Sequence, residues 1–298
     1  MNSENSLMTE RPSPPFPWGT RTYMMGILNV TPDSFSGDGL MQASDVLDAA
    51  LRQAEGFLRE GADILDVGGE STRPGAQQVG EQKELARVIP IIEALSREFP
   101  EALISVDTYK ARVAQQALAA GARWINDIWG LRADPDTGKV AAAFHAPIVL
   151  MHNRMQAGSA ELEERLGGRI VGVQYDDLLG DICTELLESV DLAHQQGIPD
   201  ELIILDPGIG FGKTVPQNLE LLNRLDAIKA LGYPVLVGPS RKSFIGYTLD
   251  LPPEERLEGT AAAVALSIDR GADIVRVHDV GVMARVARMT DAIIRRRD

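Results

Sequence analysis

The sequence predicts a single-domain (β/α)₈ barrel, and three observations support that fold class. Eight short apolar segments are spaced along the chain, starting near residues 23, 62, 103, 123, 147, 201, 234 and 273. Each segment finishes on a polar or charged residue: Asn29, Asp66, Asp107, Asn126, His152, Asp206, Ser240 and His278. Seven of the eight are followed by a helical pattern before the next segment, and the eighth precedes the last helix. In such a barrel the carboxyl ends of all strands meet at one rim, where active sites lie.

The eight expected strands are nearly continuous in apolar residues, as parallel strands covered on both faces are. In order they read MMGILNV, ADILDVGG, LISVDT, RWINDI, PIVLMHN, LIILDPG, PVLVGPS and ADIVRVHD. The helical segments between them carry apolar stripes at helical spacing, for example residues 43–60, the segment after residue 80, and the last helix from residue 282 to 293. Glycines before several strands fit the ends of helices. After the fifth strand, residues 152–170 are expected to form a polar excursion before a long helix.

The composition excludes some classes of protein. The chain has 298 residues and a formal net charge of −14, with a pI near 4.8. Sequence-independent binding of nucleic acid needs a basic face, so no nucleic-acid partner is expected. An anionic substrate requires cations gathered locally in a cleft.

The cysteine count and the chain ends indicate a cytoplasmic protein. Cys183 is the single cysteine, so no intramolecular disulfide is possible. No apolar run reaches the roughly 18 residues of a membrane span, and no membrane partner is expected. The N-terminus lacks the apolar stretch of a signal peptide. We expect residues 1–20 to form a flexible tail and residues 21–298 to form the barrel domain.

Two loops at the rim are candidates for mobile, functional segments. The first strand runs into NVTPDSFSGDG, which includes Thr31, Asp33 and Phe35 and is longer than most loops of this kind. This segment is either an ordinary turn-rich loop or a lid. The lid is favoured because Phe35 at the loop tip would be costly to expose unless it covers something. The second loop, GGESTRPGA, carries Thr72, Arg73 and Pro74. Its arginine is either a solvated charge or a fork for phosphate.

Acceptor side chains follow three other strands. Asp107 is either a helix cap or a functional carboxylate. Asn126 and Asp127 point to opposite faces of a regular strand, so at most one faces the barrel axis. Asp206 begins DPGIGFGKT, which resembles a Walker loop but has Pro207 where that motif needs glycine. The glycines there are expected to let the backbone and Phe211 approach a ligand.

Cationic side chains follow the last two strands. Lys242 and Ser243 lie in GPSRKSFIG, and Arg276 and His278 share one face of RVHD. The four histidines have no zinc-binding spacing. Together with Arg73, these cations predict a site for a multiply charged anion, and the acceptors across the rim suit the amino-amide edge of a flat heterocycle.

At these motifs the chain resembles the dihydropteroate synthase family, from about Thr22 to Ile294. The resemblance implies a pterin-binding barrel that joins 6-hydroxymethyl-7,8-dihydropterin diphosphate to 4-aminobenzoate, an alkyl-group transfer in folate biosynthesis. Its products are 7,8-dihydropteroate and diphosphate. Mg²⁺ is the implied cofactor and a homodimer the implied assembly.

The resemblance also implies a role for each motif residue. Asn29 would hold Mg²⁺ with the diphosphate, and Asp107, Asn126, Asp206 and Lys242 would hydrogen-bond the pterin. Arg276 would stack beside the pterin and meet the diphosphate with His278. The 4-aminobenzoate pocket would be shaped by Thr72, Arg73, Phe35, Pro74, Phe211 and Ser243. Asp107, Lys242 and Arg276 are the expected catalytic residues.

Two alternatives share the acceptor residues. A pterin-binding methyltransferase-type domain needs no diphosphate site, and the cations of STRPG and SRKS argue against it. A non-catalytic pterin-binding paralogue is favoured by loss of Lys242, Asp206 or Asn29, and all three are present.

Overall fold

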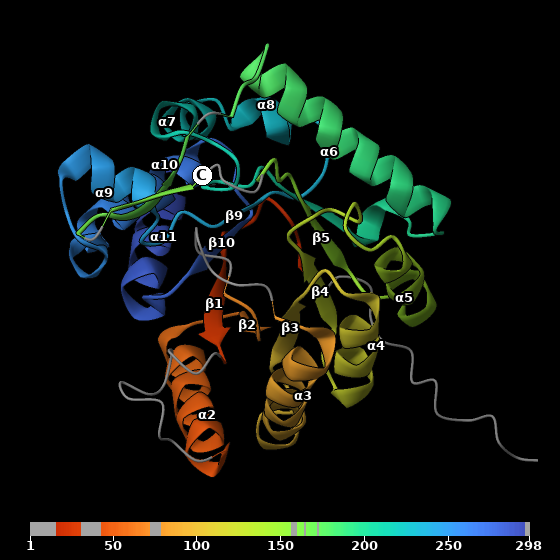
Figure 1. Cartoon of the computed structure of the whole chain (residues 1–298). Coiled ribbons are helices and arrows are strands. Elements are labelled where there is room, and N and C mark those ends of the chain that lie inside the picture. The colour runs from red at the N-terminus through yellow and green to blue at the C-terminus, as the bar shows by residue number, and fades with distance from the viewer. Residues whose placement is uncertain are drawn as a thin grey trace, which may run out of the picture.

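The computed structural model describes residues 16–30, 43–71, 79–155, 160–163, 165–171 and 173–295. Within these ranges, eight parallel strands form one sheet in the order β8-β5-β4-β3-β2-β1-β10-β9. A bridge between Leu205 and Val235 joins the two outer strands and rolls the sheet into a nearly closed barrel. Helices surround the strands on the outside, from α2 in orange to α11 in blue (Figure 1). The predicted (β/α)₈ fold is confirmed.

All eight expected strands are present, and each begins within two residues of its expected start. They are β1 (Tyr23–Asn29), β2 (Ile64–Gly68), β3 (Leu103–Asp107), β4 (Trp124–Asp127), β5 (Ile148–Met151), β8 (Ile203–Asp206), β9 (Leu236–Val237) and β10 (Ile274–Val277). The helices are α2 (Ala43–Glu60), α3 (Glu81–Glu98), α4 (Ala111–Ala120), α5 (Asp136–Phe144), α6 (Leu178–Gln195), α7 (Val215–Asn223), α8 (Asp226–Lys229), α9 (Ser243–Leu249), α10 (Leu257–Asp269) and α11 (Val280–Ile294). Short 3₁₀ turns occupy Asp200–Leu202 and Pro253–Glu255. None of the helices in the described ranges combines the length and the apolar character of a membrane span.

Glycine ends the helices where the sequence predicts it. Gly121 follows α4 with φ +119°, and its N–H bonds back to the carbonyl of Ala117. Gly61, Gly232 and Gly271 likewise have positive φ values before the next strand. Residues with a side chain rarely adopt this backbone conformation, so each glycine allows a sharp turn from helix to strand.

The inside of the barrel is apolar at its amino-terminal end. Each of the eight strands contributes an inward residue to this floor, which consists of Tyr23, Met25, Ile64, Leu103, Trp124, Val149, Ile204, Leu236 and Ile274. Phe16 and Trp18 pack beneath it, and Phe16 stacks on Tyr23 at a centroid distance of 4.0 Å. The expected tail therefore includes two residues that lie against the barrel, while residues 1–15 are outside the described part.

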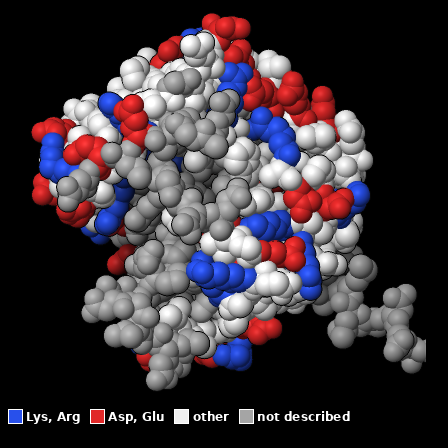
Figure 2. Space-filling model, in the orientation of Figure 1, with Lys and Arg blue, Asp and Glu red and all other residues white. Residues whose placement is uncertain are grey.

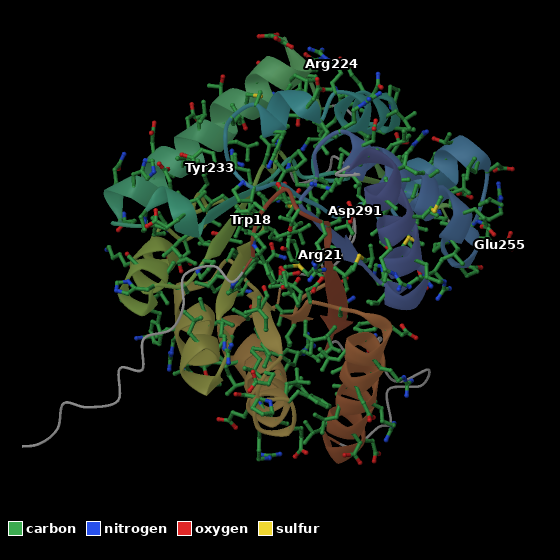
Figure 3. The ribbon with its side chains drawn as sticks, turned by 180° about the vertical axis from the view of Figure 1, so that it is seen from behind. Trp18, Arg21, Arg224, Tyr233, Glu255 and Asp291 are labelled. Carbon is green, nitrogen blue, oxygen red and sulfur yellow. The ribbon has the colours of Figure 1, made fainter. Side chains whose placement is uncertain are left out.

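A hollow lined by described residues lies at this floor. It measures about 510 Å³ and is bordered by Phe16, Trp18, Asp200 and Tyr233, among others. Seen from behind, Trp18 and Tyr233 lie close together at this end (Figure 3). The hollow is opposite to the carboxyl ends of the strands, so it is separate from the predicted site.

The excursion after β5 contains an antiparallel hairpin that the sequence did not indicate. β6 (Ala160–Glu163) pairs with β7 (Gly167–Ile170) before the chain enters α6. Arg169 pairs with Glu161 across the hairpin, and the Arg256 guanidinium donates to the Leu166 carbonyl at 2.8 Å. The first contact joins two charged residues and the second joins residues 90 positions apart, so apolar periodicity could not reveal either.

Candidate functional site

The inward side chains of the barrel change from apolar to polar between one inward position of a strand and the next. Alternate residues of a strand face the same side. Two positions after the floor residues Ile64, Trp124, Ile204 and Ile274, the inward residues are Asp66, Asn126, Asp206 and Arg276. On β3 the inward sequence is Leu103, Ser105 and Asp107. The fold therefore brings the predicted polar residues together above the floor.

Arg276 connects three of these strands. Its Nε donates to Oδ2 of Asp66 at 2.6 Å, and its Nη2 donates to Oδ2 of Asp107 at 2.6 Å. Asn126 donates to the same Asp66 oxygen at 3.0 Å. Asp66 is fully buried, and its other oxygen has no hydrogen-bond partner among the described residues. We call Asp66, Asp107, Asn126 and Arg276 the central polar cluster.

Burial controls the protonation of the carboxyl groups in this region. It raises the pKa of Asp107 to about 7, against the nearby Arg276, and Asp66 adds to the rise. Burial also raises the pKa of Asp206, opposed by Lys242 and by the Gly208 N–H, which donates to Oδ1 at 2.7 Å. Raised carboxyl pKa values in a cleft are typical of functional sites.

Lys242 lies beside this cluster and is held by the loop after β8. Its ammonium donates to the Ile209 carbonyl and stands 4.3 Å from the centre of the Phe211 ring. Burial lowers the pKa of Lys242 to about 8, while Asp206 opposes the shift and Arg276 adds to it. Lys242, Arg276 and Asp206 thus interact electrostatically at one rim, as predicted.

The structure also places Asp127 at the end of β4, Ser243 after β9 and His278 after β10. Asp127 faces away and accepts the backbone N–H groups of Trp129 and Leu131, so Asn126 is the inward residue, in agreement with the expected alternation. Ser243 begins α9, directly after Lys242. The Ser240 hydroxyl is 3.0 Å from Nδ1 of His278 and accepts the His278 backbone N–H.

Asn29 lies level with the central polar cluster. In register, Asn29 pairs with Gly68, Gly68 with Asp107 and Asp107 with Asn126. Gly68 leaves a space between its neighbours, because a Cβ there would lie 3.5 Å from Asp107 and 3.6 Å from Oδ1 of Asn29. No cluster of three or more His, Cys, Asp or Glu residues suited to a metal occurs in the described ranges.

Six predicted residues lie outside the described part of the chain. They belong to the two rim loops and are Thr31, Asp33, Phe35, Thr72, Arg73 and Pro74. Their roles stay predictions.

Three buried polar residues near the site had no role in the sequence analysis. Asp66 and His152 were noted only as strand ends, and Lys213 only as part of an imperfect Walker pattern. Strand alternation could have found Asp66, because it shares its face with the floor residue Ile64. Nothing in the local sequence pairs His152 with Lys213, which is 61 positions away.

The described residues on one face of the molecule do not extend this gathering of charge over the surface. On the face shown in Figure 2, basic side chains are interspersed with acidic ones among the described residues. Arg241, next to Lys242, pairs with Asp279 through its Nε at 2.9 Å. This charge pattern suits a small ligand at the rim better than an extended polyanion.

Comparison with known proteins identifies the family. A family profile described as "Pterin binding enzyme" matches residues 25–278. A dihydropteroate synthase of Clostridium beijerinckii is 51% identical over 279 residues, covering 93% of this chain and 96% of that protein. One from Bacillus subtilis is 53% identical, covering 92% and 89%. A crystal structure of dihydropteroate synthase from Clostridium difficile, obtained with pteroic acid, superposes with a TM-score of 0.86 at 48% identity, covering 94% of this chain and all of that one.

The barrel and its polar rim thus define a pterin-binding enzyme. Within that class the chain belongs to the dihydropteroate synthase family, whose members transfer an alkyl group.

Burial is the main cause of the raised pKa of Asp107, and the charge of Asp66 is expected to add to the rise. Asp66, Glu84 and Glu70 raise the pKa of Asp107, and Arg276 lowers it. Asp66→Asn removes one negative charge and leaves Arg276 to interact with Asp107. The pKa of Asp107 should therefore fall below its value of about 7. A ¹³C NMR titration of the aspartate carboxyl groups measures it.

Asp279→Asn is the matched control, because Asp279 pairs with Arg241 outside the cluster. An unchanged Asp107 midpoint in Asp66→Asn, or an equal shift in the control, would contradict this electrostatic assignment.

Proposed function

We propose that this chain joins 6-hydroxymethyl-7,8-dihydropterin diphosphate to 4-aminobenzoate, giving 7,8-dihydropteroate and diphosphate. The observation that carries the proposal is the meeting of Asp107, Asp206, Lys242 and Arg276 at one rim. The structure of the Xanthomonas albilineans dihydropteroate synthase with 4-aminobenzoic acid shares this fold, with a TM-score of 0.81 and 40% identity over 92% of this chain and 93% of that one.

The pterin binds to the acceptors inside the barrel. Its amino-amide edge presents parallel N–H groups, which one carboxylate accepts in the way it accepts the fork of an arginine. Asp206 is 5% exposed and Asn126 3% exposed, so both act where water does not compete. Lys242 donates a hydrogen bond to the carbonyl group of the pterin, which replaces its hydrogen bond to the Ile209 carbonyl. Arg276 lies beside the ring.

The 4-aminobenzoate binds next to Phe211 and Ser243. The Phe211 ring offers an apolar face, and Ser243 stands at the first position of α9. Thr72, Arg73, Phe35 and Pro74 complete this pocket in the proposal, on the basis of the family resemblance alone. Thr31 and Asp33 belong to the first rim loop.

The reaction is a substitution at the methylene carbon of the pterin. The bond from this carbon to the diphosphate oxygen breaks, and the amine nitrogen of 4-aminobenzoate forms the new bond and then loses one proton. Asp107 stabilises positive charge that develops on the ring and methylene. Holding both reactants aligned can lower the barrier by up to ~7–11 kcal/mol. No protein nucleophile is required.

Arg276 and His278 meet the departing diphosphate, and Asn29 would hold Mg²⁺ there. Mg²⁺ commonly keeps several waters and binds one or two protein groups plus substrate phosphates. The amide oxygen of Asn29, beside the space at Gly68, fits the pattern of one protein ligand plus substrate phosphates. When bound, Mg²⁺ supplies neutralisation of the leaving-group charge.

The proposed assembly is a homodimer in the cytoplasm. Leu266 of α10 and Met289 and Ile293 of α11 are 55%, 62% and 66% exposed, and the two helices are neighbours. Exposed apolar residues that gather on one face are typical of association sites. The sequence offers one cysteine and hence no internal disulfide, which suits a reducing compartment.

An assay of the purified protein tests the proposed activity. We expect diphosphate release only when the pterin diphosphate, 4-aminobenzoate and Mg²⁺ are all present, and its loss on addition of a chelator. Release that needs no 4-aminobenzoate points to a simple hydrolase. No release under any condition supports a non-catalytic pterin-binding protein and rejects the proposal.

Lys242→Ala should lower kcat/KM by at least about 100-fold, or ~3 kcal/mol, because it removes a partly buried cation that contacts the reacting ring in the proposed complex. Its contacts are with the Ile209 carbonyl and Phe211, so the barrel should still fold. Steady-state kinetics and circular dichroism measure both effects. Arg241→Ala is the matched control, since the neighbouring arginine pairs with Asp279; equal losses in both variants would refute the role of Lys242.

Sedimentation velocity tests the assembly. The expected species has about twice the chain mass of 32.3 kDa. Met289→Glu places a charge on the exposed apolar face and should shift the population toward monomer. A monomeric wild-type protein at micromolar concentration would reject the homodimer.

A further inference from the structure

Lys213 is a buried lysine that the proposed chemistry does not use. It is 1% exposed and lies at the end of the loop from Pro207 to Lys213, which we call the β8–α7 loop. Burial lowers the pKa of Lys213 well below its usual range. A buried lysine is expensive unless its N–H groups are paired, so its contacts indicate what keeps it there.

Three acceptors surround the Lys213 amine. Nζ is 2.9 Å from Nδ1 of His152 and 3.0 Å from the carbonyls of Gly208 and Phe211. The two carbonyls accept hydrogen bonds from Nζ, and Nδ1 of His152 can accept a third when the ring proton is on Nε2. Two of them fasten the β8–α7 loop to itself, and the third fastens it to the end of β5.

His152 is suited to accept from Lys213. Burial, with the neighbouring Lys213, lowers the pKa of His152 to about 4, so the ring is neutral at physiological pH. Accepting at Nδ1 requires the proton to be on Nε2. Nε2 lies 3.1 Å from Oε2 of Glu185, in a direction poor for a hydrogen bond. Glu185 is fixed in turn by Arg132 and Arg154.

The β8–α7 loop also packs very closely on the segment after β5. Gly208 has φ +72°, and a Cβ there would lie 1.9 Å from the His152 carbonyl oxygen. Gly212 has φ +64°, and a Cβ there would lie 2.5 Å from the Arg154 backbone. Two glycines therefore allow the backbone contact that Lys213 then secures from inside.

The opposite side of the same loop faces Lys242. The Ile209 carbonyl accepts from Lys242, and the Phe211 ring lies 4.3 Å from its ammonium. Ile209 and Phe211 thus stand between two lysines, one inside the loop and one at the rim.

We propose that Lys213, through its three hydrogen bonds to His152, Gly208 and Phe211, is a positioning residue that fixes the β8–α7 loop and thereby the position of Lys242. Lys213 touches no substrate in this scheme and acts through Ile209 and Phe211. The kinetic part of its test rests on the proposed function, whereas the spectroscopic and labelling parts do not.

The first experiment determines the tautomer of His152 by ¹⁵N NMR in the full-length wild-type protein. We expect Nδ1 to be unprotonated and Nε2 to carry the proton, with no protonation of the ring above pH 5. A proton on Nδ1 would exclude donation by Lys213 and overturn the proposal, whatever reaction the enzyme catalyses.

The second experiment compares Lys213→Met with Lys229→Met. Lys229 pairs with the buried Asp273 at 2.6 Å on the floor side of the barrel, so its loss also removes a structural lysine, but far from the rim. Lys242 reactivity toward an amine reagent is followed against pH by mass spectrometry. In Lys213→Met the midpoint should rise from its wild-type value, because a loosened Lys242 is better solvated; in Lys229→Met it should not move. An unchanged midpoint in a folded Lys213→Met, or equal shifts in both, would overturn the proposal.

Variants of His152 keep the test decisive if Lys213→Met does not fold. Asn places an acceptor near the position of Nδ1, whereas Leu has none. His152→Leu should reproduce the shift of the Lys242 midpoint, and His152→Asn should largely avoid it. Identical behaviour of the two variants would count against a hydrogen bond from Lys213.

Kinetics provide the third measurement. Displacement of the Phe211 ring should raise KM for 4-aminobenzoate by about tenfold, the equivalent of one hydrogen-bond contribution, with a smaller change in kcat. A general loss of folding lowers the active fraction and leaves KM unchanged, which would oppose the positioning role. If the wild-type enzyme makes no dihydropteroate, the proposed function fails, but the tautomer and labelling results still decide the role of Lys213.

Discussion

The site depends on the pairing of Arg276 with two carboxylates inside the barrel. A buried arginine or carboxylate is strongly unfavourable by itself, and removing one partner of a buried pair typically costs about 3–5 kcal/mol. Asp66 and Asp107 compensate the charge of Arg276, and Asn126 occupies a further position on Asp66. Because these residues come from β2, β3, β4 and β10, their hydrogen bonds align four strand ends. The two carboxylates outnumber the single arginine in these contacts, and in the proposed reaction their charge would favour a cationic centre on the pterin.

The floor makes this arrangement possible. Below the central polar cluster, inward side chains such as Trp124 and Met25 fill the barrel and exclude water. Interior packing of this kind keeps the strands at fixed positions. The polar residues that lie two residues further along each strand are therefore fixed as well. The enzyme thus combines a rigid apolar base with a rim that carries the charged side chains.

Much of this could be predicted from the sequence. The eight strands, their parallel order and the shared rim follow from apolar segments that end in polar residues. Asp107, Asn126, Asp206, Lys242 and Arg276 were found for the same reason, since each lies at or just beyond a strand end. Asp66 was noted as a strand end but received no role, because its buried bonds to Arg276 and Asn126 join strands that are distant in sequence. The partners of Lys213 could not be found, because hydrogen bonds between residues distant in sequence leave no local pattern. The β6–β7 hairpin was missed for a different reason, because its two four-residue strands, AELE and GGRI, contain few apolar residues.

The seam of the barrel has a mechanical consequence. β9 contains only two residues, and a single bridge links its approach, at Val235, to β8. The pair β9 and β10 is also short. Each of the remaining neighbouring pairs of strands in the sheet has three or more residues in register. A small widening at the seam therefore breaks few ladder bonds, and it displaces the segment that carries Lys242 relative to Arg276. The barrel is held by many ladder bonds around most of its circumference and by few at this seam, and Lys242 follows the strand beside the seam.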